Sequence, residues 1–423
     1  MKSLIIFLLI FSIIVIIHEF GHYYFARRAG ILVREFAIGM GPKLFSKQAD
    51  DGTTYTLRML PMGGYVRLAG LNDEEELEPG MSVGLVLNEL NQVETINLSE
   101  RPLANELPVR VDEADLSDQM YINAYPLNKE TLDHFDVSKE AKIMEKDGTI
   151  LMVAPKERRY ESVKVWQKIL TNFAGPMNNF ILSILVFTVI GFMIGVKPTG
   201  QWYVGEVQPN SSAALAGMVK GDQIIKMDQV EIENWEDLVA NTQKFANKDV
   251  TLTVKRGQQT IELTTKINTI KDPKTGETRG QLGITRELEM VPMTLFEKLS
   301  YGFVQTYEII VMVISVILSW FTKGFNLNEL GGPVAMAQTT QEVVQYGFMT
   351  TLQFMAAISA NLGFMNLLPI PALDGGKIIL NLVELVRGKP ISQEKEGLIS
   401  MIGVVLLLIL MVLVTWNDLM RLF

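Results

Sequence analysis

Two histidines and a glutamate stand together near the N-terminus, in the pattern His18-Glu19-x-x-His22. Positions i and i+4 of a helix lie on one face, so both imidazoles can bind a single ion while Glu19 lies beside them. This arrangement is typical of a zinc hydrolase. It predicts His18 and His22 as metal ligands and Glu19 as the group that accepts a proton from water and returns it to the leaving amine.

The setting of this motif supports a functional role. Fourteen apolar or small residues, Leu4 to Ile17, run directly into it. Ionisable side chains at membrane depth cost about 2.5 kcal/mol or more each unless they are paired or used. A cleaved signal peptide is a poor alternative, because no small-x-small cleavage site follows the apolar run and the motif would be lost with it.

The third metal ligand is expected to be a carboxylate. The chain of 423 residues has no Cys and only three His, so nitrogen and oxygen must hold the metal. The remaining histidine, His134, lies in a polar acidic stretch far from any apolar run. Asp374 is the candidate, because it lies among Pro and Gly residues within an apolar run. These Pro and Gly residues predict a broken helix, and a broken helix is tolerated in a membrane where it lines a protein cavity.

Long apolar runs separated by charged stretches predict a polytopic α-helical membrane protein with four transmembrane helices. Lys and Arg gather at the cytosolic ends of spans, so the basic residues flanking each run give its direction. Residues 303–321 are also apolar, but a crossing there would put Asp374 in the wrong leaflet. We therefore expect an interfacial or re-entrant helix at that point. The predicted transmembrane helices are 1–28, 166–196, 350–386 and 397–420, with interfacial or amphipathic helices over 294–345.

Three further regions lie between the predicted spans. Residues 34–70 form a β-hairpin region, in which alternation around Pro61 to Gly64 is typical of a hairpin that lies on the surface or dips into the membrane against protein. Residues 71–150 carry nineteen Asp and Glu against six Lys and Arg. Their strand-like stretches predict a small β-rich cytosolic module over 71–155, with an acidic solvated face. Residues 200–290 lie outside the cell and are similar to a PDZ domain of α/β type, which would bind an extended peptide.

Four motifs in this order resemble the bacterial site-2 protease family, the intramembrane zinc metalloproteases. They are the His18 to His22 motif, Gly175-Pro176-x-x-Asn179 in the second span, the PDZ region, and Asn366-x-x-Pro369-x-x-x-Leu373-Asp374-Gly375. The resemblance covers nearly the whole chain. One PDZ domain and the acidic insertion make the chain similar to the Gram-positive type.

The resemblance implies one catalytic Zn²⁺ bound by His18, His22 and Asp374, with Glu19 as the catalytic acid/base. It also implies that residues 54–68 are a re-entrant hairpin whose edge receives an unwound substrate. Simple interhelical packing is the alternative for the Gly175 to Asn179 motif. The implied substrate-binding residues are Asn366, Gly63, Gly64, Tyr65 and Asn179, with a PDZ groove near Gly221 and Ile224.

The resemblance further implies regulated intramembrane proteolysis in a bacterial plasma membrane. The expected partners are the lipid bilayer, single-pass membrane proteins or signal peptides as substrates, including anti-sigma factors and pheromone precursors, and an upstream site-1-type protease or signal peptidase. No nucleic acid is expected. A metal or ion transporter and a non-catalytic PDZ scaffold are the alternatives. A transporter would have no use for Glu next to His at helical spacing and often shows internal repeats, while a scaffold would need the metal residues only for structure.

Overall fold

The computed structural model describes residues 2–71, 77–127, 129–271 and 278–421. Residues 72–76, 128 and 272–277, which belong to the two predicted soluble regions, lie outside this range. Contacts divide the chain into one compact unit, Met1–Ile190 with Ser300–Phe423, and a second unit, Gly191–Leu299. The second unit contains the region predicted as a PDZ domain.

Five of the described helices are long and apolar enough to cross a membrane, one more than the four predicted. The additional one is α5, which covers the apolar stretch 303–321. The predicted span 350–386 is two helices, α7 and α8, separated by residues 367–373. The longer helices are α1 (Lys2–Arg28), α2 (Val165–Ile194), α5 (Leu295–Lys323), α6 (Pro333–Gln345), α7 (Phe348–Asn366), α8 (Asp374–Arg387) and α9 (Gln393–Met420).

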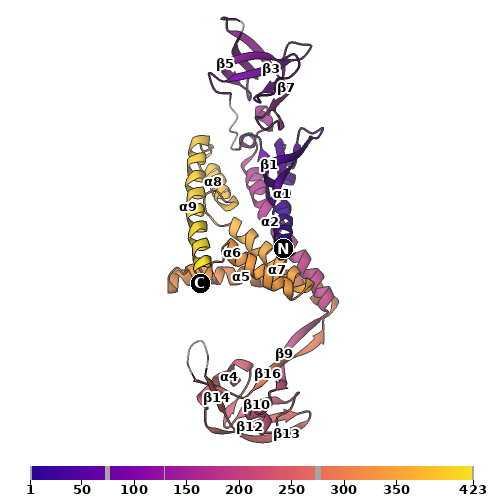
Figure 1. The fold of residues 1–423 in the computed structure, drawn as a ribbon, viewed down its shortest axis with the longest axis vertical. Helices are drawn as coiled ribbons and strands as arrows, with labels where there is room; N and C mark the ends of the chain where they lie inside the picture. The colour runs from indigo at the N-terminus through magenta and orange to yellow at the C-terminus, as the bar shows by residue number, and fades with distance from the viewer. Residues whose placement is uncertain (1, 72–76, 128, 272–277, 422–423) are drawn as a thin grey trace. The chain divides into compact units, whose positions relative to one another are not determined.

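Helix α5 lies across one end of the helical unit, at a steep angle to α9 (Figure 1). At its start, Lys298 Nζ lies 5.9 Å from the ring centroid of Phe192, in the last turn of α2. Further along α5, the Thr306 hydroxyl lies 2.9 Å from that of Ser183, in the middle of α2. Just beyond its end, the Asn328 side-chain oxygen accepts hydrogen bonds from Asn417 and Arg421, which lie at the C-terminal end of α9. The two ends of α5 therefore meet the end of α2 and the end of α9 (Figure 1).

Strands β1 (Val33–Gln48) and β2 (Thr54–Leu68) each bend, so that two strands make a sheet with four segments. Residues 35–38 pair with 64–67 on one side and with 54–57 on the other, and 54–58 also pair with 43–48. The segment order is therefore 64–68, 33–40, 54–60, 43–48. The two halves of β2 do not pair with each other. The prediction of a hairpin centred on Pro61 to Gly64 was wrong, because each half finds its partner in β1.

The acidic region folds as a small β-barrel with its own apolar core, which confirms that it is β-rich. Its strands run in the order β4-β3-β5-β6-β7-β8, and a parallel pairing of β4 with β7 closes the barrel. Leu85, Ile96, Ile122 and Ile143 are almost fully buried inside it. The strands are β3 (Ser82–Leu87), β4 (Val93–Asn97), β5 (Leu107–Asp115), β6 (Tyr121–Pro126), β7 (Asp133–Met144) and β8 (Ile150–Met152), followed by the short helices η1 (Lys156–Arg158) and η2 (Tyr160–Ser162).

The second unit is a mixed α/β domain with a core around Trp202, Ile224 and Leu252. Its central sheet has the order β11-β10-β12-β13, and β16 pairs with β9 at the entrance of the domain. The carboxamide oxygen of Asn234 accepts from the backbone N–H of Asp237 and caps α4. The elements are β9 (Val196–Val207), α3 (Ser212–Leu215), β10 (Gln223–Met227), β11 (Val230–Glu231), α4 (Trp235–Lys244), β12 (Asp249–Arg256), β13 (Gln259–Lys266), β14 (Asn268–Lys271), β15 (Thr278–Gln281) and β16 (Ile284–Pro292). The short η3 (Leu327–Glu329) follows α5 in the first unit.

Candidate metal centre and catalytic cavity

Helix α1 brings its two histidines to one carboxylate of α8. His18 Nε2 lies 3.2 Å from Asp374 Oδ2, and His22 Nε2 lies 3.3 Å from the same oxygen. The two Nε2 atoms are 3.2 Å apart. The side chains are 9 to 12% exposed, so three candidate ligand atoms from distant parts of the sequence form a small, nearly buried triangle.

The donor set of this triangle fits zinc. With the ring protons on Nδ1, both Nε2 atoms and the Asp374 oxygen are acceptors, and a cation between them removes their mutual repulsion. Zinc bonds of about 2.0–2.1 Å put neighbouring tetrahedral ligands about 3.3 Å apart, and the three measured separations match this value. Three protein ligands also leave a fourth position open, as catalytic zinc sites do.

Helix α2 fixes the orientation of both imidazoles. His22 Nδ1 lies 2.8 Å from the Thr171 carbonyl oxygen, which can only accept, so the proton is on Nδ1 and Nε2 is left for the metal. His18 Nδ1 lies 3.2 Å from the Asn179 side-chain nitrogen, while the buried Asn179 Oδ1 has no partner. Turning this amide by 180° would let Oδ1 accept from His18 Nδ1–H. Both histidines would then have the same tautomer.

Glycines allow the segment carrying Asp374 to turn back on itself. Asp374 is the first residue of α8, directly after the break that follows α7. A Cβ on Gly375 would overlap the Leu367 and Leu368 carbonyl oxygens, and one on Gly376 would overlap that of Ile370. The Asp374 carboxylate reaches the histidines because the first turn of α8 packs directly on the end of α7.

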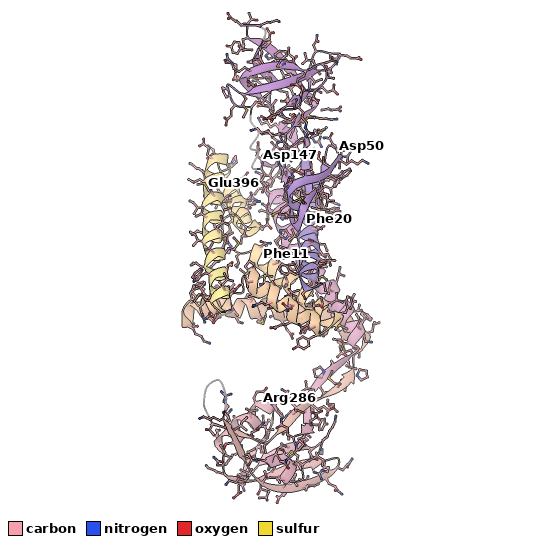
Figure 2. The ribbon with its side chains drawn as sticks, viewed as in Figure 1. Phe11, Phe20, Asp50, Asp147, Arg286 and Glu396 are labelled. Carbon is pink, nitrogen blue, oxygen red and sulfur yellow. The ribbon has the colours of Figure 1, made fainter. Side chains whose placement is uncertain are left out.

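The three ligand candidates line a cavity of about 370 Å³, which also holds Glu19, Asn366 and Tyr65. Glu19 comes from α1, Asn366 from the last turn of α7 and Tyr65 from the edge segment of the β1–β2 sheet. Val66 and Leu68 of that segment and Phe11 of α1 (labelled in Figure 2) are apolar parts of the lining. A reactive centre therefore lies between a metal-binding face and a β-edge.

The structure places the other predicted substrate-binding residues elsewhere. Neither Gly63 nor Gly64 is among the lining residues of this cavity, and a Cβ on Gly64 would meet the Ala37 carbonyl oxygen. Asn179 is fully buried behind His18. In the second unit, Ile224 is 1% exposed in the core and Gly221 occupies a turn with φ of 89°.

Two kinds of residue were missed from the sequence. Lys377 lines the cavity one turn after Asp374, and the i, i+3 spacing on a helix was the available signal. In the second unit, a hollow of about 130 Å³ lies between α4 and residues 280–284. Its apolar lining includes Leu238, Val239 and Leu282. The Gly-x-Leu-Gly-Ile sequence at 280–284 was the local signal. Gly221 and Ile224, near which the sequence predicted a groove, are not among the residues that line this hollow.

The chain is similar to known proteins over its whole length. The model of peptidase family M50 matches residues 6–410. The chain is 45% identical over 427 residues to a protein of Enterococcus faecalis named probable protease eep, with all of both chains covered. It is 43% identical to a putative zinc metalloprotease of Streptococcus pyogenes and 40% identical to one of Streptococcus pneumoniae, again with complete coverage. Among solved structures, the PDZ domain of an SdrC-like protein from Listeria monocytogenes is 21% identical, with a TM-score of 0.18, over 21% of this chain and 90% of that one.

Proposed function

Because the chain belongs to peptidase family M50 and is an intramembrane zinc metalloprotease, we propose that it hydrolyses a peptide bond within transmembrane segments, using His18, His22 and Asp374 to hold the zinc. The observation that carries this assignment is the triangle of acceptor atoms 3.2–3.3 Å apart. Bound there, zinc would supply Lewis acidity, polarising a carbonyl group and lowering the pKa of water.

Glu19 is the proposed general base and acid. It lines the same cavity as the three ligands, from the helix that carries both histidines. Its carboxylate accepts a proton from the attacking water and returns it to the amine of the leaving peptide. His22, hydrogen-bonded to Thr171, and His18, backed by Asn179, keep their orientation while this happens.

The edge segment Gly64–Leu68 is the proposed place for the substrate backbone. A transmembrane helix satisfies its own carbonyl groups, so it must unwind before attack, and a free strand edge can replace the lost hydrogen bonds. This segment is an outer one in the sheet order and contributes Tyr65, Val66 and Leu68 to the cavity lining. Asn366, which also lines the cavity, can bond the substrate backbone.

We propose four transmembrane spans in a bacterial plasma membrane, with α5 as an interfacial helix. The start of α5 lies against the last turn of α2, where Lys298 is 5.9 Å from the Phe192 ring centroid, and η3, just after α5, is hydrogen-bonded to the C-terminal end of α9. In this topology the C-terminal ends of α2 and α9 lie on the same side of the membrane. A helix that crossed the membrane could not connect them. This topology puts the acidic module in the cytosol, and the N-terminus, the PDZ-like unit and the C-terminus outside.

The proposed substrates are single-pass membrane proteins or signal-peptide remnants, including anti-sigma factors and pheromone precursors. A first cut by a site-1-type protease or a signal peptidase would precede the cut inside the membrane. The family resemblance supports this part of the proposal, and a short remnant is also easier to unwind against an edge than a span held at both ends.

The test compares two variants of the purified enzyme on a synthetic signal peptide in detergent. Glu19→Gln should retain zinc and lose cleavage by at least about a hundredfold, the scale of general acid–base catalysis. His22→Ala should lose both zinc and cleavage. Glu308→Gln, an acid on α5 bonded to Gln305, is the control and should keep both. Full cleavage by Glu19→Gln would refute the proposed mechanism.

A further inference from the structure

The acidic module contacts the β1–β2 sheet through the turn between β7 and β8. Glu145 Oε1 accepts from Arg67 Nη1 at 2.6 Å. Asp147, whose position near the sheet is labelled in Figure 2, lies 3.8 Å from Arg58 and 4.0 Å from Lys43. The turn therefore presents two carboxylates to three cations of the sheet.

A hydrogen bond from a side chain of the sheet holds the same turn. The Thr54 hydroxyl donates to the carbonyl oxygen of Ile150, the first residue of β8. Asp147 itself is ordered by its own turn, where its side chain accepts from the Thr149 backbone N–H at 2.8 Å. Burial raises the pKa of Asp147, but the hydrogen bonds from Thr149 and the charges of Lys43 and Arg58 lower it more, so the group is ionised at neutral pH.

The cations of the sheet converge on one buried carboxylate. Glu35 is 0% exposed. Arg58 donates to its Oε1 at 3.0 Å, the Tyr65 hydroxyl donates to its Oε2 at 2.8 Å, and Arg67 lies 3.9 Å from Oε2. A buried carboxylate is tolerated only with such partners, so the positions of these three side chains depend on one another.

The network ends at the catalytic cavity. Tyr65 and Arg67 both belong to the edge segment Gly64–Leu68, and Tyr65 lines the cavity beside Glu19. Its ring also lies under the Arg58 guanidinium, with 5.4 Å between the cation and the ring centroid. A continuous chain of polar contacts thus runs from Glu145 and Asp147 of the module, through Arg67, Arg58 and Glu35, to the edge that faces the reactive centre.

We propose that the Glu145–Ile150 turn of the acidic module is a positioning element that holds the Gly64–Leu68 edge in register with the zinc site for substrate binding. This inference rests on the proposed function of that edge. Neither Glu145 nor Asp147 is among the residues that line the catalytic cavity, so they act through Arg67 and Arg58. Loosening the turn should weaken substrate binding and leave the chemical step intact.

The experiment uses the full-length enzyme in detergent and a synthetic signal peptide with a fluorophore and a quencher on either side of its apolar core. Glu145→Gln should raise KM about tenfold, the scale of one lost charge-assisted hydrogen bond, with kcat and zinc content within about twofold of the parent. Glu145→Asp should restore most of the loss. Asp133→Asn is the matched control, because Asp133 begins the same strand but pairs with Lys129 on the exposed surface of the module.

The outcomes separate positioning from general stability. An unchanged KM in Glu145→Gln, or an equal rise in Asp133→Asn, would overturn the inference. A loss of zinc or a lowered melting temperature that accompanies the effect would assign the turn a structural role instead. If the turn positions the edge, the double variant Glu145→Gln with Asp147→Asn should raise KM further than Glu145→Gln alone. Failure of the proposed function would look different, since Glu19→Gln would then still cleave.

Discussion

Gly175 of α2 lies directly against the imidazole ring of His22. A Cβ on residue 175 would overlap His22 Nε2, would lie 2.7 Å from His22 Cε1, and would lie 2.8 Å from His18 Cε1. The second transmembrane helix therefore reaches the metal centre with its backbone, at a position where only glycine fits. On the other side of the contact, Gly21 of α1 packs against the Ala174 backbone in the same way.

Gly175→Ala should displace the histidine rings and weaken zinc binding. Overpacking at a tight contact costs about 1–3 kcal/mol, which corresponds to roughly five- to 160-fold in zinc affinity. Competition with a chelator, followed by metal analysis, measures this affinity. Gly397→Ala in α9 is the control, because a Cβ there meets nothing within 4 Å. Equal zinc affinities in the two variants would contradict the packing argument.

Asn179 should act on the metal through His18. Asn179→Leu removes the acceptor for His18 Nδ1–H, so zinc affinity should fall by about ten- to a hundredfold, the usual effect of losing such a partner. Asn179→Asp keeps an acceptor and should stay within about threefold of the parent. Asn178→Leu is the matched control, since its side chain bonds the Ile17 carbonyl and not an imidazole. A role in substrate binding alone would raise KM without changing the zinc affinity.

Single cysteines test the topology in this Cys-free chain. An impermeant thiol reagent on intact cells should label Lys248→Cys in the PDZ-like unit and spare Arg110→Cys in the acidic module, because basic residues flank the module at both ends. Lys323→Cys, at the end of α5, decides the number of spans. Labelling from outside is expected for an interfacial α5, whereas protection there would mean that α5 crosses the membrane.

Deleting residues 200–290 should show whether the PDZ-like unit filters or recruits substrates. The deletion is structurally reasonable because Pro198 of β9 pairs with Met290 of β16, so the chain ends lie close together. We expect a filter, because the proposed topology puts the unit outside and the zinc site toward the cytosolic half of the membrane. The deleted enzyme should then cleave substrates whose outer domain has not been trimmed. If the unit recruits substrates through its groove, the deleted enzyme should instead cleave trimmed substrates more slowly.

A point variant tests the same question if the deletion variant does not fold. Val239→Glu puts a charge into the hollow beside α4, at a side chain that is already 42% exposed. It should slow the cleavage of trimmed substrates only if the groove recruits them. Leu215→Glu, at a 76% exposed site that does not line the hollow, is its control. Unchanged cleavage of both substrate forms, in a deletion that still binds zinc, would defeat both versions.

Much of the candidate site could be predicted because its chemistry is local. Two histidines four residues apart share a helix face whatever surrounds them, and the absence of Cys narrows the remaining ligands to carboxylates. The Pro and Gly residues around Asp374 predict a break, since Pro removes a backbone donor and both residue types disfavour a helix interior. Apolar runs and β-strand patterns are also local, so they predicted the apolar helices and the β-rich module.

Pairing between distant segments could only be decided by the tertiary structure. The two halves of β2 look like a hairpin along the sequence, yet both pair with β1, because strand partners are chosen by the sheet as a whole and not by neighbours in the chain. The same holds for the hollow at residues 280–284, for Asn179 behind His18, and for Glu35, whose partners come from the two halves of β2. A local pattern determines which side chains an element can present. Burial and register, which depend on contacts between residues far apart in the sequence, decide what those side chains meet.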